Sequence, residues 1–205
     1  MAQLYHMILY PTETLYALGV NGFADNEIQQ LVNLKGRGSD KYTSVLVRDI
    51  ADIEQWAVLS DTARLVAEQF LPGSITLVLP VHDGLNGAIL PLDRTLGFRI
   101  SPDHTAQQVI ADFMAEHNAP LTCTSANVSG LPPQSTVPEI LEQFGERASE
   151  IGTVVDDGPR SGAPSTVVRV VREEIIVHRE GAIAEADIRA VVNYPDAGHE
   201  GIGYA

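Results

Sequence analysis

The stretch Pro120-Leu121-Thr122-Cys123-Thr124-Ser125-Ala126-Asn127-Val128-Ser129-Gly130 joins an apolar, β-branched run to a loop of hydroxyl and amide side chains. Residues 120–124 predict a buried strand, and Gly130 with the prolines that follow it predicts a turn. In open α/β sheets, ligands bind beyond the carboxyl ends of the strands. Ser125 and Asn127 would present a hydroxyl and an amide there to a phosphate or a sugar. An ordinary hydroxyl-rich turn accounts for the same residues, so this stretch alone leaves both interpretations open.

Short β-branched runs alternate with helical patterns along the rest of the chain, which indicates an α/β fold. The other expected strands span residues 4–10, 43–47, 75–79, 96–100, 153–156, 166–171 and 175–178, with a hairpin turn at 172–174. The expected helices span residues 26–34, 49 or 52 to 56, 61–70, 105–117, 137–144 and 185–192. Ser60 can cap one helix, and a capping box at Thr136-Val137-Pro138-Glu139 opens another. We expect a single domain over residues 1–192 and a flexible tail over residues 193–205.

Composition narrows the class of protein. The chain of 205 residues has 44% hydrophobic content, which suffices for one sizeable core. No apolar run approaches the roughly 20 residues that a membrane span needs, and the N-terminus lacks the pattern of a signal peptide. Because Cys123 is the single cysteine, an internal disulfide and a cysteine metal cluster are both excluded. We therefore expect a reduced, cytoplasmic protein that does not associate with membranes.

The charge balance argues against nucleic acid as a direct ligand. The chain has 13 Lys and Arg residues against 27 Asp and Glu residues, which gives a net charge of −14 at pH 7. Nucleic-acid affinity depends mainly on cationic contacts to phosphates, so this overall field would repel RNA and DNA. A local basic groove remains compatible with the sequence, but we expect no stable, direct binding of nucleic acid.

Three further groups of residues are candidates for a polar pocket. Lys35-Gly36-Arg37 ends an expected helix, where both cations can turn toward one phosphate or carboxylate, although favourable charge at a helix C-terminus explains the pair equally well. Pro11-Thr12-Glu13-Thr14 follows the first strand and fits either a small polar pocket or an ordinary turn. Arg99 lies inside the apolar strand 96–100, and a buried arginine needs an anionic partner or ligand.

Several catalytic motifs are absent from the sequence. The chain contains neither a P-loop nor a dinucleotide-binding G-x-G-x-x-G, and it has no G-x-S-x-G elbow. Its six histidines lack the spacing of a zinc site, so we expect no metal held by protein side chains. Cys123 fits a small core residue better than a nucleophile.

Taken in order, the blocks resemble the YrdC-type threonylcarbamoyl-AMP synthases. The matching segments are P-T-E-T-x-Y-A-L-G at 11–19, K-G-R at 35–37, P-G-S-I-T-L at 72–77, G-F-R-I at 97–100, T-S-A-N-V-S-G at 124–130, P-S-T-V-V at 164–168 and R-E-G-A-I at 179–183. The resemblance implies a twisted, open mixed sheet with flanking helices around a positively charged cavity. It also implies a nucleotidyltransferase that condenses L-threonine, bicarbonate and ATP, with Mg²⁺, into threonylcarbamoyl-AMP and pyrophosphate. A separate transferase complex would then carry the threonylcarbamoyl group to an adenosine beside the tRNA anticodon.

The resemblance also implies roles for individual residues. Lys35 and Arg37 are expected to be catalytic, because positioning and charge neutralisation supply most catalysis of this kind. The residues expected to bind ATP are Lys35, Arg37, Lys41, Thr95, Ser125, Asn127, Pro133 and Arg179. The residues expected to bind threonine are Thr14, Arg99, Ser165 and the backbone near Cys123. Mg²⁺ is expected to be held mainly by ATP oxygens and water, with Glu13 as an indirect partner.

The chain departs from the family pattern in three places. Members usually carry a further helix before the first strand, so we expect either an upstream start site or a C-terminal segment that covers the exposed sheet face. Tyr42 stands where proline is common. The extra C-terminal domain of the longer family form, and a lid supplied by it, are not expected. Two other functions fit the same blocks: a paralogue that binds nucleotide or RNA without synthase activity, and a carbamoyl-adenylating relative that uses carbamoyl phosphate.

Overall fold

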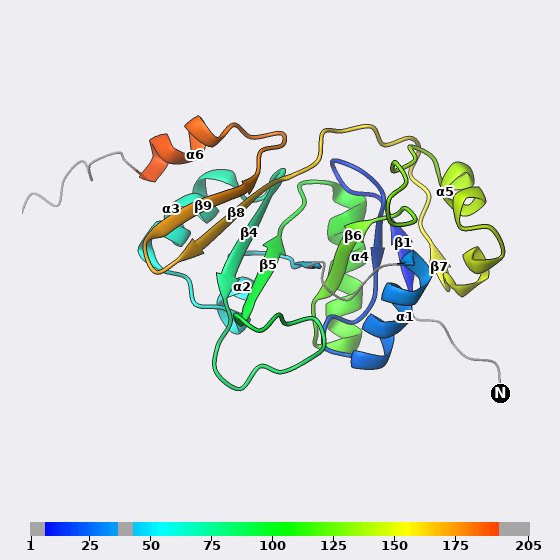
Figure 1. Ribbon diagram of the computed structural model, residues 1–205, viewed down its shortest axis with the longest axis horizontal. Coiled ribbons are helices and arrows are strands. Elements are labelled where there is room, and N and C mark those ends of the chain that lie inside the picture. Colours follow the sequence, from blue (N-terminus) through cyan, green and yellow to red (C-terminus); the bar gives the residue numbers. More distant parts are fainter. Residues whose placement is uncertain (1–6, 37–42, 193–205) are drawn as a thin grey trace, which may run out of the picture.

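A nine-stranded sheet runs through the part of the chain described by the computed structural model, which comprises residues 7–36 and 43–192 (Figure 1). The strands are β1 (Ile8–Tyr10), β2 (Ala17–Gly19), β3 (Ser44–Leu46), β4 (Ile75–Pro80), β5 (Thr95–Arg99), β6 (Leu121–Ser125), β7 (Thr153–Val154), β8 (Thr166–Val171) and β9 (Glu174–Arg179). The helices are α1 (Asp25–Lys35), α2 (Ile50–Trp56), α3 (Asp61–Phe70), α4 (His104–His117), α5 (Val137–Phe144) and α6 (Glu185–Val192), with a 3₁₀ helix, η1, at Gly145–Glu150.

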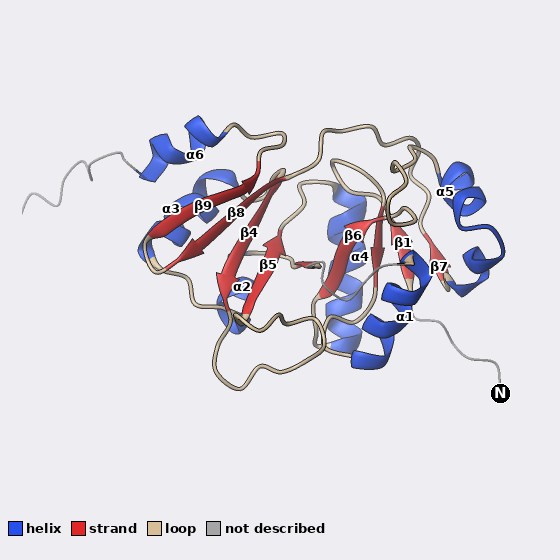
Figure 2. Cartoon of the chain, in the orientation of Figure 1, coloured by secondary structure: helices blue, strands red, loops and turns tan. Residues whose placement is uncertain are grey.

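The sheet is mixed, as the sequence analysis expected. Its strand order is β7-β1-β2-β6-β3-β5-β4-β8-β9. The pairs β1 with β7, β3 with β5 and β4 with β8 are parallel, and the other five neighbouring pairs are antiparallel. Strands far apart in the sequence therefore lie side by side, and helices flank the sheet (Figure 2). This arrangement confirms the α/β fold class.

Local capping explains where several helices begin. The side chain of Asp49 accepts a hydrogen bond from the backbone N–H of Asp52 at the start of α2, which decides between the two aspartates as the cap. Ser60 caps α3 in the same way, through the N–H of Ala63. At α5, the Glu139 carboxylate accepts from both the backbone N–H and the hydroxyl of Thr136, so the expected capping box is present.

The hydrophobic core lies between the sheet and the helices that pack on it. Ile75, Leu77 and Leu79 alternate along β4 and are fully buried, and α3 packs against this strand. Helix α4 packs against β1 and β6, while α6 packs against α3, beside β8 and β9 and away from β1 (Figure 1). No helix in the described residues is both long enough and apolar enough to cross a bilayer.

Two elements were not expected from the sequence. Strand β2 has three residues, all buried, and Gly19 weakens the strand signal because glycine packs no side chain. Its role comes from pairing with β1 and β6, which no local pattern reveals. The 3₁₀ helix η1 follows α5 directly and has no buried residue, so the sequence shows no hydrophobic periodicity that would predict it. The first residues of the expected strand 4–10 and the expected tail 193–205 lie outside the described residues.

Candidate active site

A cavity of about 870 Å³ opens on one face of the sheet, and β5 forms its floor. Side chains alternate between the two faces of a strand, so Thr95, Gly97 and Arg99 face the cavity. Leu96 and Phe98 point the other way and are buried in the core. The same alternation brings Thr76 and Val78 of β4, Val167 and Arg169 of β8, and Cys123 and Ser125 of β6 to the cavity wall.

Gly97 keeps the middle of this floor open. The register places it opposite Ser44 on β3 and Val78 on β4. A Cβ atom at position 97 would lie 3.0 Å from Cγ2 of Thr76 and 3.2 Å from Cβ of Ser44, which is tighter than ordinary contact. A side chain here would therefore push against both neighbours and fill the cavity.

The cavity gathers the described residues that the sequence analysis singled out. Ten of them line it: Thr14, Lys35, Thr95, Arg99, Cys123, Ser125, Asn127, Pro133, Ser165 and Arg179. Arg37 and Lys41, which were expected to bind ATP, lie outside the described residues. Residues from seven separate stretches of sequence thus meet at one site, although their individual roles remain predictions.

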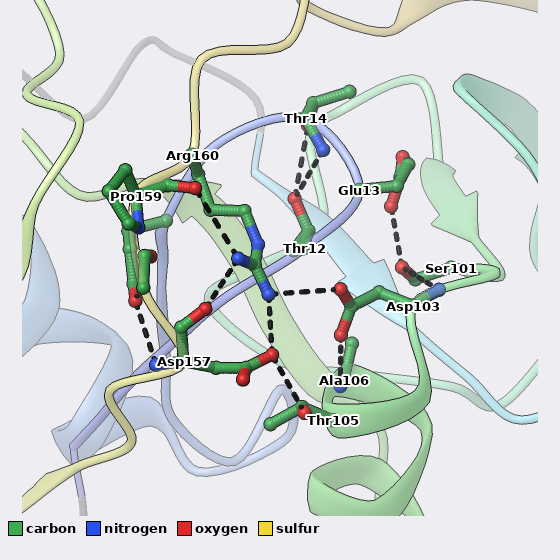
Figure 3. Close-up of polar contacts among 12 residues, drawn as sticks. Thr12, Glu13, Thr14, Ser101, Asp103, Thr105, Ala106, Asp157, Pro159 and Arg160 are labelled. Atoms are coloured by element: carbon green, nitrogen blue, oxygen red, sulfur yellow. Dashed lines mark hydrogen bonds and ion pairs between the residues drawn. The ribbon is translucent and has the colours of Figure 1, made fainter.

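Arg99 is the cation of the site that pairs with Glu13. Its Nη2 donates to Oε1 of Glu13 at 2.6 Å and lies 3.4 Å from Oγ1 of Thr14, and its Nη1 lies 3.5 Å from Sγ of Cys123. The second oxygen of Glu13 accepts from the hydroxyl of Ser101 at 2.5 Å (Figure 3). The Nε of Arg99 is buried without a hydrogen-bond partner among the described residues. This partnership between Arg99 and Glu13 is not visible in the sequence, because 86 residues separate the two.

The groups around Arg99 keep its guanidinium protonated. Burial by itself would lower the pKa of Arg99, but the nearby Cys123, Glu13 and Tyr10 outweigh that cost and raise it above its ordinary value. Tyr10 lies under the same cluster, where burial raises its pKa well above the usual range and its hydroxyl donates to the carbonyl of Thr122 at 2.9 Å. Arg99 is therefore a permanent cation in a largely dry setting.

Lys35 holds the loop at the end of β6, which contains the S-A-N residues 125–127. Its buried Nζ donates to the carbonyls of Ser125 and Asn127, the second at 2.9 Å. The hydroxyl of Ser125 in turn donates to Oδ1 of Asn127 at 2.5 Å, and the amide nitrogen of Asn127 donates to the carbonyl of Leu131 at 2.8 Å. The lysine that ends α1 and the S-A-N turn after β6 form one polar cluster at the cavity wall.

Arg179, at the end of β9, lies on another wall. Its Nε and Nη2 donate to the backbone carbonyl of Ser165 at 3.2 and 2.7 Å. The hydroxyl of Ser165 lies 2.9 Å from that of Thr76. Burial, and then the positive charge of Arg99, lower the pKa of Arg179 below its ordinary value. Within the described residues, Arg179 forms no ion pair with a carboxylate.

A loop that no motif marks in the sequence crosses the Pro11–Thr14 turn. We call residues 157–163 the crossing segment. The N–H of Gly162 donates to the carbonyl of Thr14 at 2.8 Å, and a Cβ at position 162 would lie 2.8 Å from Cα of Thr14. Arg160 binds Asp103 at 3.2 Å and Asp157 at 2.6 Å (Figure 3). The glycines of this segment were its only signal in the sequence, since its partners lie far away in the chain.

The lining carries more positive than negative side chains. Among the described residues it contains Lys35, Arg99, Arg169 and Arg179 against the single carboxylate of Asp93. Asp93 and Arg169, which form an ion pair at 3.0 Å, were not predicted as site residues. In the described part of the chain, no three His, Cys, Asp or Glu side chains gather closely enough to hold a metal ion. The site can therefore bind an anionic ligand through cations, hydroxyls and amides.

Comparison with known proteins identifies the family. The model for the Sua5, YciO and YrdC proteins, described as telomere recombination, matches residues 5–181. The chain therefore belongs to the Sua5/YciO/YrdC family, as the sequence blocks indicated. The solved structure of Escherichia coli YciO has a TM-score of 0.75 over 86% of this chain and 84% of that one, and at 21% identity it supports the fold alone.

Within the family, the chain is similar to proteins named threonylcarbamoyl-AMP synthase. One from Actinobacillus succinogenes is 30% identical over 85% of this chain and 92% of its own length. One from Bacillus subtilis is 30% identical over 91% of this chain, which spans only 53% of that relative. The crystal structure of Pyrococcus abyssi Sua5 complexed with L-threonine has a TM-score of 0.80 and 26% identity, covering 92% of this chain and 54% of that one.

Proposed function

We propose that this chain is an L-threonylcarbamoyladenylate synthase, which condenses L-threonine, bicarbonate and ATP to threonylcarbamoyl-AMP and pyrophosphate for tRNA modification. The observation that carries the proposal is the convergence of ten expected residues on one cavity. The relatives named threonylcarbamoyl-AMP synthase and the threonine-bound Sua5 structure support the same reading. An enzyme of this kind needs a site for an amino acid next to a site for a triphosphate.

Two groups of lining residues suit these two ligands. Threonine would place its carboxylate against Arg99, with Thr14, Ser165 and the backbone at Cys123 around its other groups. ATP would extend past Lys35, Ser125 and Asn127, which offer a cation, a hydroxyl and an amide. The remaining ATP contacts would come from Thr95, Pro133 and Arg179, together with Arg37 and Lys41.

The difficult step is attack on the α-phosphate. The threonine amine and bicarbonate first form a carbamate with loss of water. A carbamate oxygen then forms a bond to the α-phosphorus, and the bond from that phosphorus to the β-phosphate oxygen breaks, which releases pyrophosphate. Holding the two anions together against their repulsion is the main task, and the lining cations, with Lys35 and Arg37 as the catalytic pair, would perform it.

Mg²⁺ would accompany ATP in this reaction and neutralise phosphate charge. Asp93 is the single carboxylate among the described lining residues, and it is paired with Arg169. These side chains fit a cation held mainly by phosphate oxygens and water, rather than by a protein cage. Glu13 has both oxygens occupied by Arg99 and Ser101.

The product would pass to a separate tRNA threonylcarbamoyl transferase complex. With a net charge of −14, the chain would not bind tRNA stably by itself. We place the reaction in the cytoplasm, where the proposed substrates and acceptor RNA occur together.

Mass spectrometry tests the proposal directly. The purified chain is incubated with ATP, Mg²⁺, bicarbonate and L-threonine, and each is omitted in turn. We expect a threonylcarbamoyl-adenylate that requires all three substrates. ATP binding without product would favour a non-synthase paralogue, whereas product from carbamoyl phosphate in place of threonine and bicarbonate would favour a carbamoyl-adenylating enzyme.

A further inference from the structure

One end of the cavity differs from the rest because it presents a carboxylate. Asp93 lies in the loop before β5 and lines the cavity together with Thr95 and Arg169. Its Oδ1 accepts from the hydroxyl of Thr95 at 2.9 Å and lies 3.3 Å from the backbone nitrogen of Thr95. Its Oδ2 pairs with Nη2 of Arg169 at 3.0 Å. The carboxylate is thus held on both sides, one third exposed and facing the cavity.

This arrangement fixes the direction of the hydrogen bond from Thr95. An ionised carboxylate can only accept, so the single hydroxyl hydrogen of Thr95 is committed to Asp93. The hydroxyl oxygen then offers only lone pairs to anything else in the cavity. Thr95 is nine-tenths buried or more, so the donor to Asp93 has little freedom to rotate toward another partner.

Two acceptor groups side by side are a poor place for phosphate. Phosphate oxygens are themselves anionic acceptors, and next to Asp93 and Thr95 they would meet unmatched lone pairs, while the charge of Arg169 is already balanced by Asp93. The cationic cluster of Lys35 lies with Ser125 and Asn127 instead. Along β5, Thr95 is four residues from Arg99, a distance of about 13 Å, so a ligand that spans the floor reaches both ends.

We propose that Asp93, held by Arg169, is a positioning residue that makes Thr95 an acceptor for a hydrogen-bond donor on the nucleoside of ATP, and so contributes to nucleotide selection. The inference rests on the proposed function, because it assigns the nucleoside to this end of the same cavity. The donor is an N–H or O–H group, which the 6-amino group of adenine and the ribose hydroxyls both supply. Guanine has a carbonyl at the same position as that amine and would place acceptor against acceptor.

Equilibrium binding to the full chain tests the inference. Calorimetry without threonine compares ATP with purine riboside triphosphate, which lacks the 6-amino group, and with the 2′-deoxy and 3′-deoxy forms of ATP. We expect one of these analogues to bind the wild-type chain about tenfold more weakly than ATP, as the loss of one buried hydrogen bond predicts. The analogue affected shows whether the base or the sugar supplies the donor.

The variant Asp93→Asn then reverses the hydrogen-bond direction. The charge-assisted contact from Arg169 at 3.0 Å outweighs the longer contact from the backbone N–H of Thr95 at 3.3 Å, so we expect the amide to keep its oxygen toward Arg169 and to turn its NH₂ group toward Thr95. The Thr95 hydroxyl then accepts from the amide and donates into the cavity, so ATP and the affected analogue should bind within about twofold of each other. Thr95→Val removes the acceptor and should give the same loss of discrimination. Asp83→Asn is the matched control, since Asp83 is exposed in the same loop, and should leave the discrimination unchanged.

The outcomes separate this inference from the proposed function. Equal wild-type binding of all four nucleotides, or unchanged discrimination in both Asp93→Asn and Thr95→Val, would overturn the inference even if the chain makes threonylcarbamoyl-AMP. Loss of discrimination in the two variants would support it even if no product forms. A chain that binds no nucleotide would contradict both.

Discussion

Arg99 enters the cavity from its floor and Arg179 enters it from one wall, and their surroundings differ sharply. Arg99 is paired with Glu13 at 2.6 Å, both side chains are about nine-tenths buried, and the effect of burial, which would lower the pKa of Arg99, is outweighed by Cys123, Glu13 and Tyr10. Arg179 contacts the backbone carbonyl of Ser165 and has no carboxylate partner within the described residues. Its pKa is lowered by burial and by Arg99.

The difference shows how two arginines in one cavity can serve different ligands. A paired arginine keeps its place and its charge whether or not a ligand is bound, so it suits the precise placement of a small amino acid. An arginine without a counter-charge gains more from an incoming anion, because the ligand supplies the missing partner. Arg179 therefore suits a triphosphate, and Arg99 suits the carboxylate of threonine.

Filling the cavity floor at Gly97 should impair the binding of both ligands and give the largest loss of activity. Gly97→Val would place a branched side chain against Thr76 and Ser44 and in the path of both ligands. We expect kcat/KM to fall at least a hundredfold for ATP and for threonine alike, because a small displacement of reacting groups is enough for such a loss. Steady-state kinetics for each substrate measures this, with Gly97→Ala as the smaller step in the series. A loss confined to one substrate would mean that the ligands do not share the floor.

Removing Arg99 should affect threonine far more than ATP, and it also tests the pairing of Arg99 with Glu13. Arg99→Ala is expected to raise the threonine KM about a hundredfold and the ATP KM far less, as loss of a charge-assisted contact predicts. It also leaves Glu13 buried and unpaired, which should lower the free energy of unfolding by about 3 kcal/mol.

The double variant Arg99→Ala, Glu13→Gln distinguishes the two consequences. It removes the orphaned charge, so denaturant unfolding should show much of the stability restored while the threonine KM stays high. If the double variant regains threonine affinity, Arg99 is structural. Equal effects of Arg99→Ala on both substrates would lead to the same conclusion.

Removing Arg179 should affect ATP more than threonine, and the change in KM should be smaller than that expected for Arg99→Ala. Arg179→Met keeps much of the volume and leaves no carboxylate unpaired among the described residues. We expect the ATP KM to rise about tenfold, and the free energy of unfolding to change by less than about 1 kcal/mol. Kinetics at saturating threonine and urea unfolding provide the two measurements. A destabilisation as large as that of Arg99→Ala would contradict the proposed difference between Arg179 and Arg99.

Much of the fold was readable from the sequence because its signals are local. The apolar runs of β4, β5 and β8 and the caps at Ser60 and Thr136 place elements within one or two residues of their observed ends. Strand β2 was missed because three buried residues carry no periodicity, and only its neighbours make it a strand.

The site was predictable as a set of residues but not as a network. Motif blocks pointed to Lys35, Ser125, Asn127 and Arg179, and the structure brings them to one cavity. The partners that hold those residues come from distant parts of the chain, as the contact between Arg99 and Glu13 shows. Asp93 follows a loop without a motif, so its bond to Thr95 becomes visible only in three dimensions.

Arg160 of the crossing segment offers the finest test, since its contacts within the described residues lead toward Glu13 and Arg99 and none of them involves Arg179. Arg160 bonds to Asp157 and Asp103, and Asp103 is joined through Ser101 to Glu13 (Figure 3). Arg160→Gln should raise the threonine KM about threefold and leave the ATP KM unchanged, with a stability loss below about 1 kcal/mol.

The stability loss in Arg160→Gln should also depend on pH in a defined direction. The Arg160 guanidinium and then the Thr105 hydroxyl hold the pKa of Asp157 below its ordinary value. A carboxyl group with a lowered pKa in the folded state contributes its stability above the unfolded value, about 3.9, and loses it as pH falls through the folded value. The stability difference between wild type and Arg160→Gln should thus be full at pH 6 and shrink on acidification below about pH 4. Urea unfolding at a series of pH values measures it, and a difference that grows toward low pH would show that Arg160 acts through some other contact.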